Sequence, residues 1–461
     1  MRQPILLLVL GGAADRACPS LGGRTPLLYA RTPNLDEFAH HAQCGVAEVL
    51  GPGAAPSADL AHLAFLGYGA REHHPGRAFL EALGEGLDPL PDEVVLRARL
   101  ALVQVRRMRL VTFDRAPVLP EEDARRMAEA AARWEDEAFR VRLVPTGGGE
   151  GLLFLRTAEG EAASPHLRDS DPFAAGRDLR RPSPEPDAPD PPAARRTAHA
   201  LAEYLLWAYR ALNGLDIAAV REARARGLRW ALLSRGAGRW RRVPPFAGWT
   251  GLQGGILASE PALRGLGRFL GLRWIEPPAR PDPADQMEAA IAAGRAGLGA
   301  GLDFVLVHAP GPERAAAEGV QAKARALEAV DQGLGVSLLH MARSGEAVVA
   351  VTADGAAPCE GEAAMLRGAE PVPFAVAGRG VVADACRLFD ELHCAEGMLG
   401  RFRGEEVLPR LLAFADRGRR AGLLPPRPGE RLEPPPTEPL WDAGVWEEPG
   451  PAEGSHGPES A

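Results

Sequence analysis

Three uninterrupted apolar runs constrain the fold of this chain more than any other feature of its sequence. They cover residues 5–10, 304–308 and 347–352, and the first ends in a pair of glycines. Strands that are buried on both faces of a parallel sheet have such continuous runs, whereas half-exposed strands alternate. Between the second and third runs, residues 316–341 place apolar side chains three and four positions apart, which predicts an amphipathic helix. We therefore expect an α/β protein built from strand, helix, strand units.

The middle of the chain predicts a separate lobe with its own secondary structure. We expect strands near 140–144 and 152–155, helices at 121–132 and 197–212, and a flexible surface loop at 182–192, where Pro, Asp, Glu and Ser predominate.

The length of 461 residues exceeds what one hydrophobic core usually serves. We expect a core domain formed by 1–110 and 285–424, an inserted substrate lobe over 111–284, and a disordered Pro- and Glu-rich tail over 425–461.

Composition excludes several classes of protein. The net charge of -8 disfavours nucleic-acid binding, and no apolar run approaches the roughly 18 residues of a membrane span. The five cysteines are odd in number and lack CxxC spacing, which argues against a disulfide framework or a zinc knuckle. We expect reduced thiols and a soluble, cytoplasmic protein. Lys323 is the only lysine, which we interpret as a compositional bias.

Four short motifs follow one another in a fixed order. They are Leu-Gly-Gly-Arg-Thr-Pro-Leu at 21–27, Thr-Pro-Asn-Leu-Asp at 32–36, Leu-Gly-Tyr at 66–68 and Glu-Pro-Val-Pro-Phe at 370–374. Together they resemble the archaeal-type, 2,3-bisphosphoglycerate-independent phosphoglycerate mutases of the alkaline phosphatase superfamily.

This resemblance implies a fold and an activity. The fold is an alkaline-phosphatase-like core sheet with helices on both faces, interrupted by a smaller α/β lobe that closes over substrate. The activity is the interconversion of 3-phosphoglycerate and 2-phosphoglycerate through a phosphoserine, an isomerase reaction of glycolysis that needs two divalent ions (Mn²⁺, Mg²⁺ or Zn²⁺).

Most positions at which the resemblance implies a metal ligand or the nucleophile have changed. Asp354 is retained and Glu313 replaces an aspartate, so these two are the residual metal positions. The other five positions hold Gly11, Ala58, Ala317, Gly355 and Arg367. Two carboxylates do not hold two ions, because each ion takes about four to six ligands. We therefore expect a catalytically degenerate member with no metal cofactor, kept for ligand binding, regulation or protein interaction.

The alternative is an active mutase with a rearranged centre. Ser57, one residue before the implied nucleophile, would then attack phosphate, although a serine after a proline is more simply a helix N-cap. Its rebuilt metal site would use Asp59, Glu313, Asp354 and Glu370.

Other polar side chains have two interpretations. Arg77, Arg97 and Arg367 are candidate binding residues for a phosphorylated small molecule; Arg221, Arg224 and Arg235 could also contact an anion, or could be surface charges. Three histidines near the implied nucleophile, His62, His73 and His74, could ligate a different metal, but the adjacent pair should point apart. A protein partner fits a degenerate member equally well.

Overall fold

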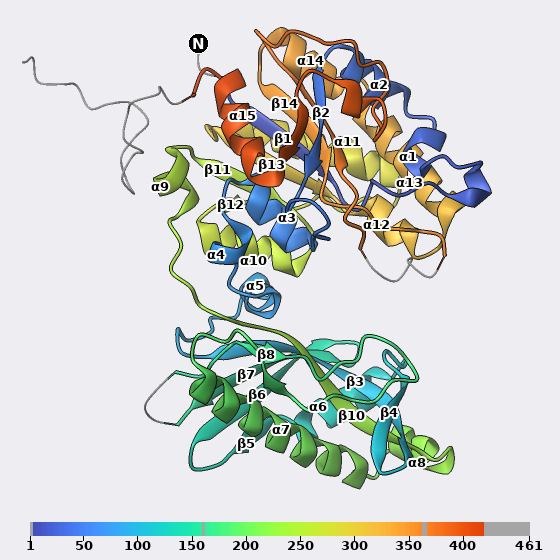
Figure 1. The fold of residues 1–461 in the computed structure, drawn as a ribbon, viewed down its shortest axis with the longest axis vertical. Helices are drawn as coiled ribbons and strands as arrows, with labels where there is room; N and C mark the ends of the chain where they lie inside the picture. Colours follow the sequence, from blue (N-terminus) through green and yellow to red (C-terminus); the bar gives the residue numbers. More distant parts are fainter. Residues whose placement is uncertain (1–2, 159–161, 362–366, 419–461) are drawn as a thin grey trace, which may run out of the picture.

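The computed structural model describes residues 3–158, 162–361 and 367–418, which form two bodies joined side by side (Figure 1). The predicted tail over 425–461 lies outside the described residues. In the described residues no helix is long and apolar enough to cross a membrane.

The larger body is built on a mixed eight-stranded sheet in the order β12-β11-β13-β1-β14-β15-β2-β16. The three predicted apolar runs are its centre, where β1 pairs in parallel with β13 and β14, so that Ile5 faces Phe304 on one side and Val348 on the other. The strands are β1 Ile5–Leu10, β2 Gln43–Glu48, β11 Gly254–Leu257, β12 Arg273–Trp274, β13 Phe304–Ala309, β14 Val348–Ala353, β15 Val372–Ala377 and β16 Gly400–Arg403.

Helices pack on both faces of this sheet, as the alkaline-phosphatase-like fold requires (Figure 1). The first group is α1 Pro26–Tyr29, α2 Pro33–His40, α11 Pro283–Gly299, α12 Gly311–Ala316, α13 Val320–Leu334 and α14 Ser337–Ser344. The second is α3 Ala58–Phe65, α4 Ala70–His73, α5 Arg77–Gly84, α9 Phe246–Thr250, α10 Pro261–Leu270 and α15 Val407–Phe414. Short 3-10 turns, η1 Pro19–Leu21, η3 Cys394–Glu396 and η4 Gly404–Glu406, complete the connections.

The single helix predicted over 316–341 is in fact two. Gly335 adopts φ +48°, a left-handed conformation that ends α13, and α14 starts two residues later. Both segments are helical, as the apolar spacing predicts, but the spacing alone does not reveal the break between them.

The smaller body is a six-stranded antiparallel sheet in the order β10-β3-β7-β6-β5, with β4 paired to β3. Its elements are β3 Val94–Arg106, β4 Arg109–Asp114, α6 Glu121–Ala130, β5 Arg133–Glu135, β6 Phe139–Gly147, β7 Glu150–Thr157, β8 Leu167–Arg168, β9 Ser183–Pro184, α7 Pro191–Gly214, α8 Ala218–Ala225 and β10 Leu228–Arg239.

The sheets set the limits of the lobe at 94–239, which differs from the predicted 111–284. β3 belongs to the lobe sheet because it pairs with β7 and β10, and β11 and β12 belong to the core sheet because they extend it from β13. The segment 182–192, predicted as a loop, contains β9 and the side chain of Asp190, which caps α7 by accepting from the Ala193 amide.

Each body has its own buried apolar cluster, and a small third cluster lies between them. In this third cluster, Phe79 of α5 packs with Val95 and Phe154 of the lobe sheet and lies edge-to-face with Phe269 of α10. The junction is therefore apolar at its middle.

Candidate functional site

The carboxyl ends of parallel core strands meet at one edge of the sheet, and the loops that follow them form the candidate site. The amide of Gly11, after β1, donates to the carbonyl of Ala309 (2.8 Å), and the amide of Gly12 donates to Asp354 Oδ1 after β14 (2.7 Å). Gly12 has φ +60°, which glycine adopts without strain. Open α/β sheets bind ligands outside this edge, and the implied metal positions lie here too.

Arg367 fills the centre of this edge. Its guanidinium pairs with Asp354 (Nη1 to Oδ1, 3.4 Å) and, through Nη2, with Glu313 of α12. Burial alone would raise the pKa of the fully buried Asp354, but the Arg367 charge, together with the neighbouring His308 and His62, outweighs it and the pKa is lowered. Burial raises the pKa of Glu313, against the opposing effect of Arg367. The centre is thus a largely buried cluster of one cation and two carboxylates.

The neighbours of two changed positions have closed over the space that a side chain would need. A Cβ at Gly11 would lie 2.8 Å from His308 Nε2. A Cβ at Gly355 would lie 3.1 Å from Pro56 Cγ and 3.3 Å from Arg367 Nη1. Larger side chains at Gly11 and Gly355 would therefore displace the groups that now occupy the centre.

Two histidines lie behind the arginine. The rings of His62 in α3 and His308 in β13 are perpendicular, with centroids 4.9 Å apart. Burial and the neighbouring His308 lower the pKa of His62 to about 4, so His62 is neutral at pH 7 and its Nδ1–H donates to the Ala58 carbonyl (2.7 Å). His308 Nε2 lies 3.7 Å from Asp354 Oδ2, too far for a hydrogen bond.

These groups do not fit a two-metal centre. Each ion needs about four to six ligands. Among the residues that the structure describes, the groups of three or more His, Cys, Asp or Glu atoms close enough to share an ion are two cysteine-containing clusters elsewhere. The residual positions Glu313 and Asp354 are brought together as predicted, but around the charge of Arg367, which repels a cation at this distance.

Ser57, the candidate nucleophile, occupies the N-cap position of α3, but its hydroxyl accepts no capping hydrogen bond. That hydroxyl instead helps to hold Asp59 ionised. Asp59 accepts from His74 Nε2 (2.6 Å) and Arg77 Nη1 (2.9 Å). Its burial favours a raised pKa, but these partners outweigh burial and lower the pKa. Asp59 is therefore already paired with the Arg77 guanidinium and with an imidazole N–H.

The three histidines proposed as another metal site do not converge. His62 and His73 each bond the carbonyl four residues earlier, Ala58 and Gly69, and His74 is held by Asp59. Each ring therefore has a local structural role.

A row of alternating charges crosses from the core to the lobe. Arg77, at the start of α5, pairs with Glu81 one turn later (2.9 Å), and Glu81 also accepts from Arg97 of β3 (2.8 Å). Arg97 lies 3.8 Å from Glu150 of β7, which pairs with Arg99. The predicted binding residues Arg77 and Arg97 thus lie together, each held by protein carboxylates.

Beside this row lies Arg235 of β10. It lines a small pocket with Arg97, Arg99, Glu150 and Asp171. Burial lowers the pKa of Arg235 to about 10, and the charges of Arg97 and Arg99 add to this effect. No carboxylate in the described part of the chain forms an ion pair with Arg235. By contrast, Arg221 pairs with exposed Asp216, and Arg224 donates to the Asn213 carbonyl, both on the far side of the lobe sheet.

The only lysine has a structural role that sequence reasoning missed. Lys323 is fully buried, and its Nζ donates to the carbonyls of Ala14 and Ala357 and to Asp15 Oδ2, each at 2.8 Å. It therefore ties α13 to the loops after β1 and β14. The sequence did contain one indication of this role, because a single lysine is kept in a chain whose other basic side chains, apart from histidine, are all arginine.

A second connection comes from the segment between Cys386 and Cys394. Its Glu391 accepts from Thr25 Oγ1 (2.8 Å) and from the Asp15 amide (3.0 Å). Burial raises the pKa of Glu391 to about 7. This segment therefore also holds the loop after β1, through the Asp15 amide.

Comparison with known proteins agrees with this fold. The family model described as 2,3-bisphosphoglycerate-independent phosphoglycerate mutase matches residues 39–217. Proteins of that name from Methanopyrus kandleri and Ignicoccus hospitalis are 33% and 32% identical, over 90% and 92% of this chain and 97% and 100% of their own lengths.

Solved structures give the same result. A Pyrococcus horikoshii protein superposes with a TM-score of 0.72 at 25% identity, covering 92% of this chain and all (100%) of that one. The cofactor-independent phosphoglycerate mutase of Thermoplasma acidophilum superposes with a TM-score of 0.59 at 28% identity, covering 90% and 100%.

The eight-stranded mixed sheet, the inserted lobe and the site at the strand ends define an α/β protein with the alkaline-phosphatase fold. Within that class, the chain belongs to the 2,3-bisphosphoglycerate-independent phosphoglycerate mutase family. The family and fold expected from the four motifs are confirmed.

Proposed function

We propose that this chain binds a phosphorylated small molecule between core and lobe and does not transfer phosphoryl groups through two metal ions. The observation that supports this proposal is the Arg367 guanidinium between Asp354 and Glu313, the two residual ligand positions. A fixed protein cation and two bound ions would compete for the same carboxylates.

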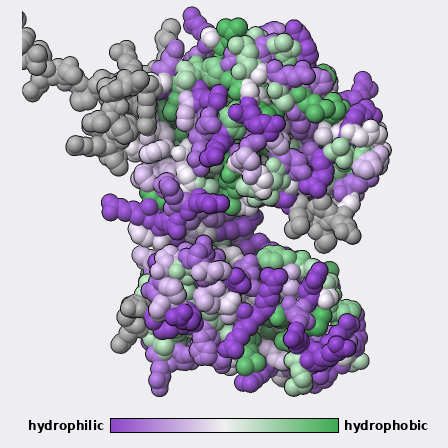
Figure 2. Space-filling model, viewed as in Figure 1, coloured by the Kyte–Doolittle hydropathy of each residue, from purple (hydrophilic) through white to green (hydrophobic). Residues whose placement is uncertain are grey.

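Arginines on the lobe surface support the binding half of the proposal. Guanidinium groups donate in a planar fork that matches phosphate oxygens. Arg97, Arg99 and Arg235 lie around one pocket, and only Arg235 lacks a carboxylate partner. Figure 2 shows a hollow between core and lobe on one side of the molecule. A phosphate group would satisfy Arg235.

Calorimetric titration with 3-phosphoglycerate tests binding. We expect saturable binding that Arg235→Ala weakens at least about tenfold, because one charge-assisted contact contributes roughly 1.5–3 kcal/mol. Arg221→Ala is the matched control, since that exposed arginine pairs with Asp216 and should leave affinity unchanged. Equal affinity in both variants would reject the proposed pocket.

A mutase assay with added Mn²⁺, Mg²⁺ or Zn²⁺ tests the chemistry. We expect no turnover above the buffer rate and no pair of bound Mn²⁺ ions by elemental analysis. Mn²⁺ is the informative ion because thiolates bind it weakly.

A second candidate function, an active mutase, is favoured by the names of the relatives, which are phosphoglycerate mutases over nearly the whole chain. It requires Ser57 as nucleophile and Asp59, Glu313, Asp354 and Glu370 as ligands, after release of Arg77 and Arg367 from these carboxylates. Metal-dependent turnover that Ser57→Ala abolishes would establish this candidate and overturn the first.

A cytoplasmic location and a protein partner stay predictions. The first follows from reduced cysteines, and the described cysteines are all free thiols.

A further inference from the structure

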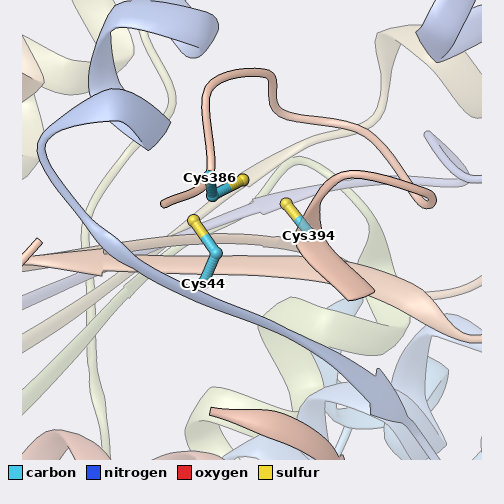
Figure 3. A group of neighbouring side chains, drawn as sticks. All are labelled: Cys44, Cys386 and Cys394. Atoms are coloured by element: carbon cyan, nitrogen blue, oxygen red, sulfur yellow. The ribbon is translucent and has the colours of Figure 1, made fainter. Parts of the chain in front are cut away.

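Three cysteine thiols meet beside β2 of the core sheet (Figure 3). Cys44 lies in β2, Cys386 in the segment after β15, and Cys394 at the start of η3. Their sulfur atoms all lie within 4.8 Å of one another, and none of the three residues is more than 5% exposed. The three side chains point toward a common centre from three separate segments.

A single buried thiol packs as a small apolar group and needs no other explanation. Three facing thiols differ, because sulfur atoms gathered around one point are the donor set that soft metal ions select. All three are free, and an odd number cannot be used up by disulfides among themselves.

A carboxylate behind the cluster holds the three segments in place. Asp384 accepts from the amides of Cys44 (2.8 Å), Cys386 (3.0 Å) and Met398 (2.9 Å). Partners of this kind, which fix the backbone of a ligand residue without touching the ion, accompany metal sites.

We propose that Cys44, Cys386 and Cys394 bind one soft metal ion with a filled d shell, of the Zn²⁺ class. Three atoms within 4.8 Å of one another lie at most about 2.8 Å from a common centre. Inward movements of about half an ångström therefore reach the ~2.3 Å zinc–sulfur distance. Each thiol loses its proton to solvent as its sulfur binds the ion.

The second cysteine-containing cluster does not offer an equivalent site. Asp15, Cys18 and Cys359 also lie within 4.8 Å of one another, but the Lys323 ammonium donates to Asp15 Oδ2 at 2.8 Å. That cation already neutralises the cluster and repels an ion. The Asp15, Cys18 and Cys359 cluster therefore serves as a control for the three-thiol site.

Local spacing could not reveal the three-thiol site. Cys44 and Cys386 come from opposite ends of the chain, and the fold brings them together beside β2, which pairs with β15 and β16. The prediction that the cysteines form no zinc knuckle excluded close-spaced motifs, but not a site assembled from opposite ends of the chain.

Cd²⁺ titration of the reduced, chelator-treated full chain tests the proposal, because cadmium thiolates absorb in the near ultraviolet. We expect absorbance that saturates at one ion per chain and a rise in unfolding temperature on addition of Zn²⁺. Cys386→Ser should abolish the stoichiometric signal, and Asp384→Asn should weaken binding about 10–100-fold. The double variant Cys18→Ser/Cys359→Ser should retain it.

Two results would overturn the proposal: no saturation at one equivalent in the wild type, or loss of the signal in the Cys18→Ser/Cys359→Ser variant with retention in Cys386→Ser. Circular dichroism of each variant without metal shows whether it is folded. If Cys386→Ser is unfolded, Cys44→Ala provides the same comparison from the strand side.

Discussion

At the scale of single residues, Arg367 decides the character of the candidate site. Its guanidinium pairs with both Asp354 and Glu313. A buried carboxylate that loses such a partner is left uncompensated, which usually costs more than the pair contributed.

We expect Arg367→Ala to lower the free energy of unfolding by about 3–5 kcal/mol, measured by urea denaturation at pH 7. Arg401→Ala is the matched control, because Arg401 pairs with Glu48 at the surface and should cost about 0–1 kcal/mol. Equal costs would show that the central pair is not effectively buried.

Lowering the pH should remove part of the stability that the Asp354–Arg367 pair contributes. The pKa of Asp354 is lowered in the folded protein, so its contribution is complete above the unfolded value near pH 4 and is lost as the pH falls further. Arg367→Ala should therefore show a weaker loss of stability below pH 4 than the wild type.

The pH dependence of stability expected from Glu391 has the opposite sign to that expected from Asp354. Its folded pKa is raised to about 7, so its stabilising effect is complete below the unfolded value near pH 4.5 and declines as the pH rises through 7. Between pH 5 and pH 8, we expect the wild type to lose about 1–2 kcal/mol more than Glu391→Gln in urea denaturation, after allowance for solvent screening. Parallel pH profiles would contradict this prediction.

At this scale, the sequence predicted which positions lie at the candidate site better than it predicted the ion-pair partners of its side chains. It identified Glu313, Asp354 and Arg367 as changed or residual ligands, and the structure brings them together. It did not predict that Arg77 and Arg97 are held by protein carboxylates, because the Arg77–Asp59 and Arg97–Glu81 pairs depend on how separate elements pack against one another.

At the scale of elements, close packing of α5 against α10 positions the charges at the junction. A Cβ at Gly265 of α10 would lie 1.7 Å from the Leu80 carbonyl oxygen of α5. The two helices can approach this closely only because the residue has no side chain.

We expect Gly265→Ala to destabilise the protein by more than 2 kcal/mol in urea denaturation, because backbone must move to relieve the contact. Gly299→Ala in α11 is the control: a Cβ there meets no atom within 4 Å, so the gain in helix propensity should leave stability unchanged or raised by up to about 1 kcal/mol. Destabilisation by both would indicate a general cost of alanine, and not the helix crossing.

Element types were predictable from apolar spacing, but their ends and sheet membership were not. β3 and β11 both contain apolar residues, and only strand pairing assigns one to the lobe and the other to the core. The division at Gly335 has the same origin, since the conformation of one glycine ends a helix whose apolar pattern continues.

At the scale of the whole molecule, the two bodies have separate apolar cores and share a small cluster around Phe79. Cooperative unfolding of such a chain depends on that junction.

We expect Phe79→Ala to separate calorimetric unfolding into two transitions, because it removes apolar contact between core and lobe. Phe246→Ala, a fully buried aromatic of the core alone, should lower the core transition without changing the coupling in the same way. A single transition in Phe79→Ala would show that the charged row across the junction is sufficient for coupling.

The burial of Lys323 has a practical consequence for chemical labelling. This side chain is the only ε-amine in the chain, and it is 0% exposed with its three hydrogens donated. Acylating reagents should therefore modify the native protein at its α-amino group alone and reach Lys323 only when α13 separates from the loop after β1. The fraction of protein whose mass shows acylation of Lys323 would then report how often α13 separates from the loop after β1, without an engineered probe.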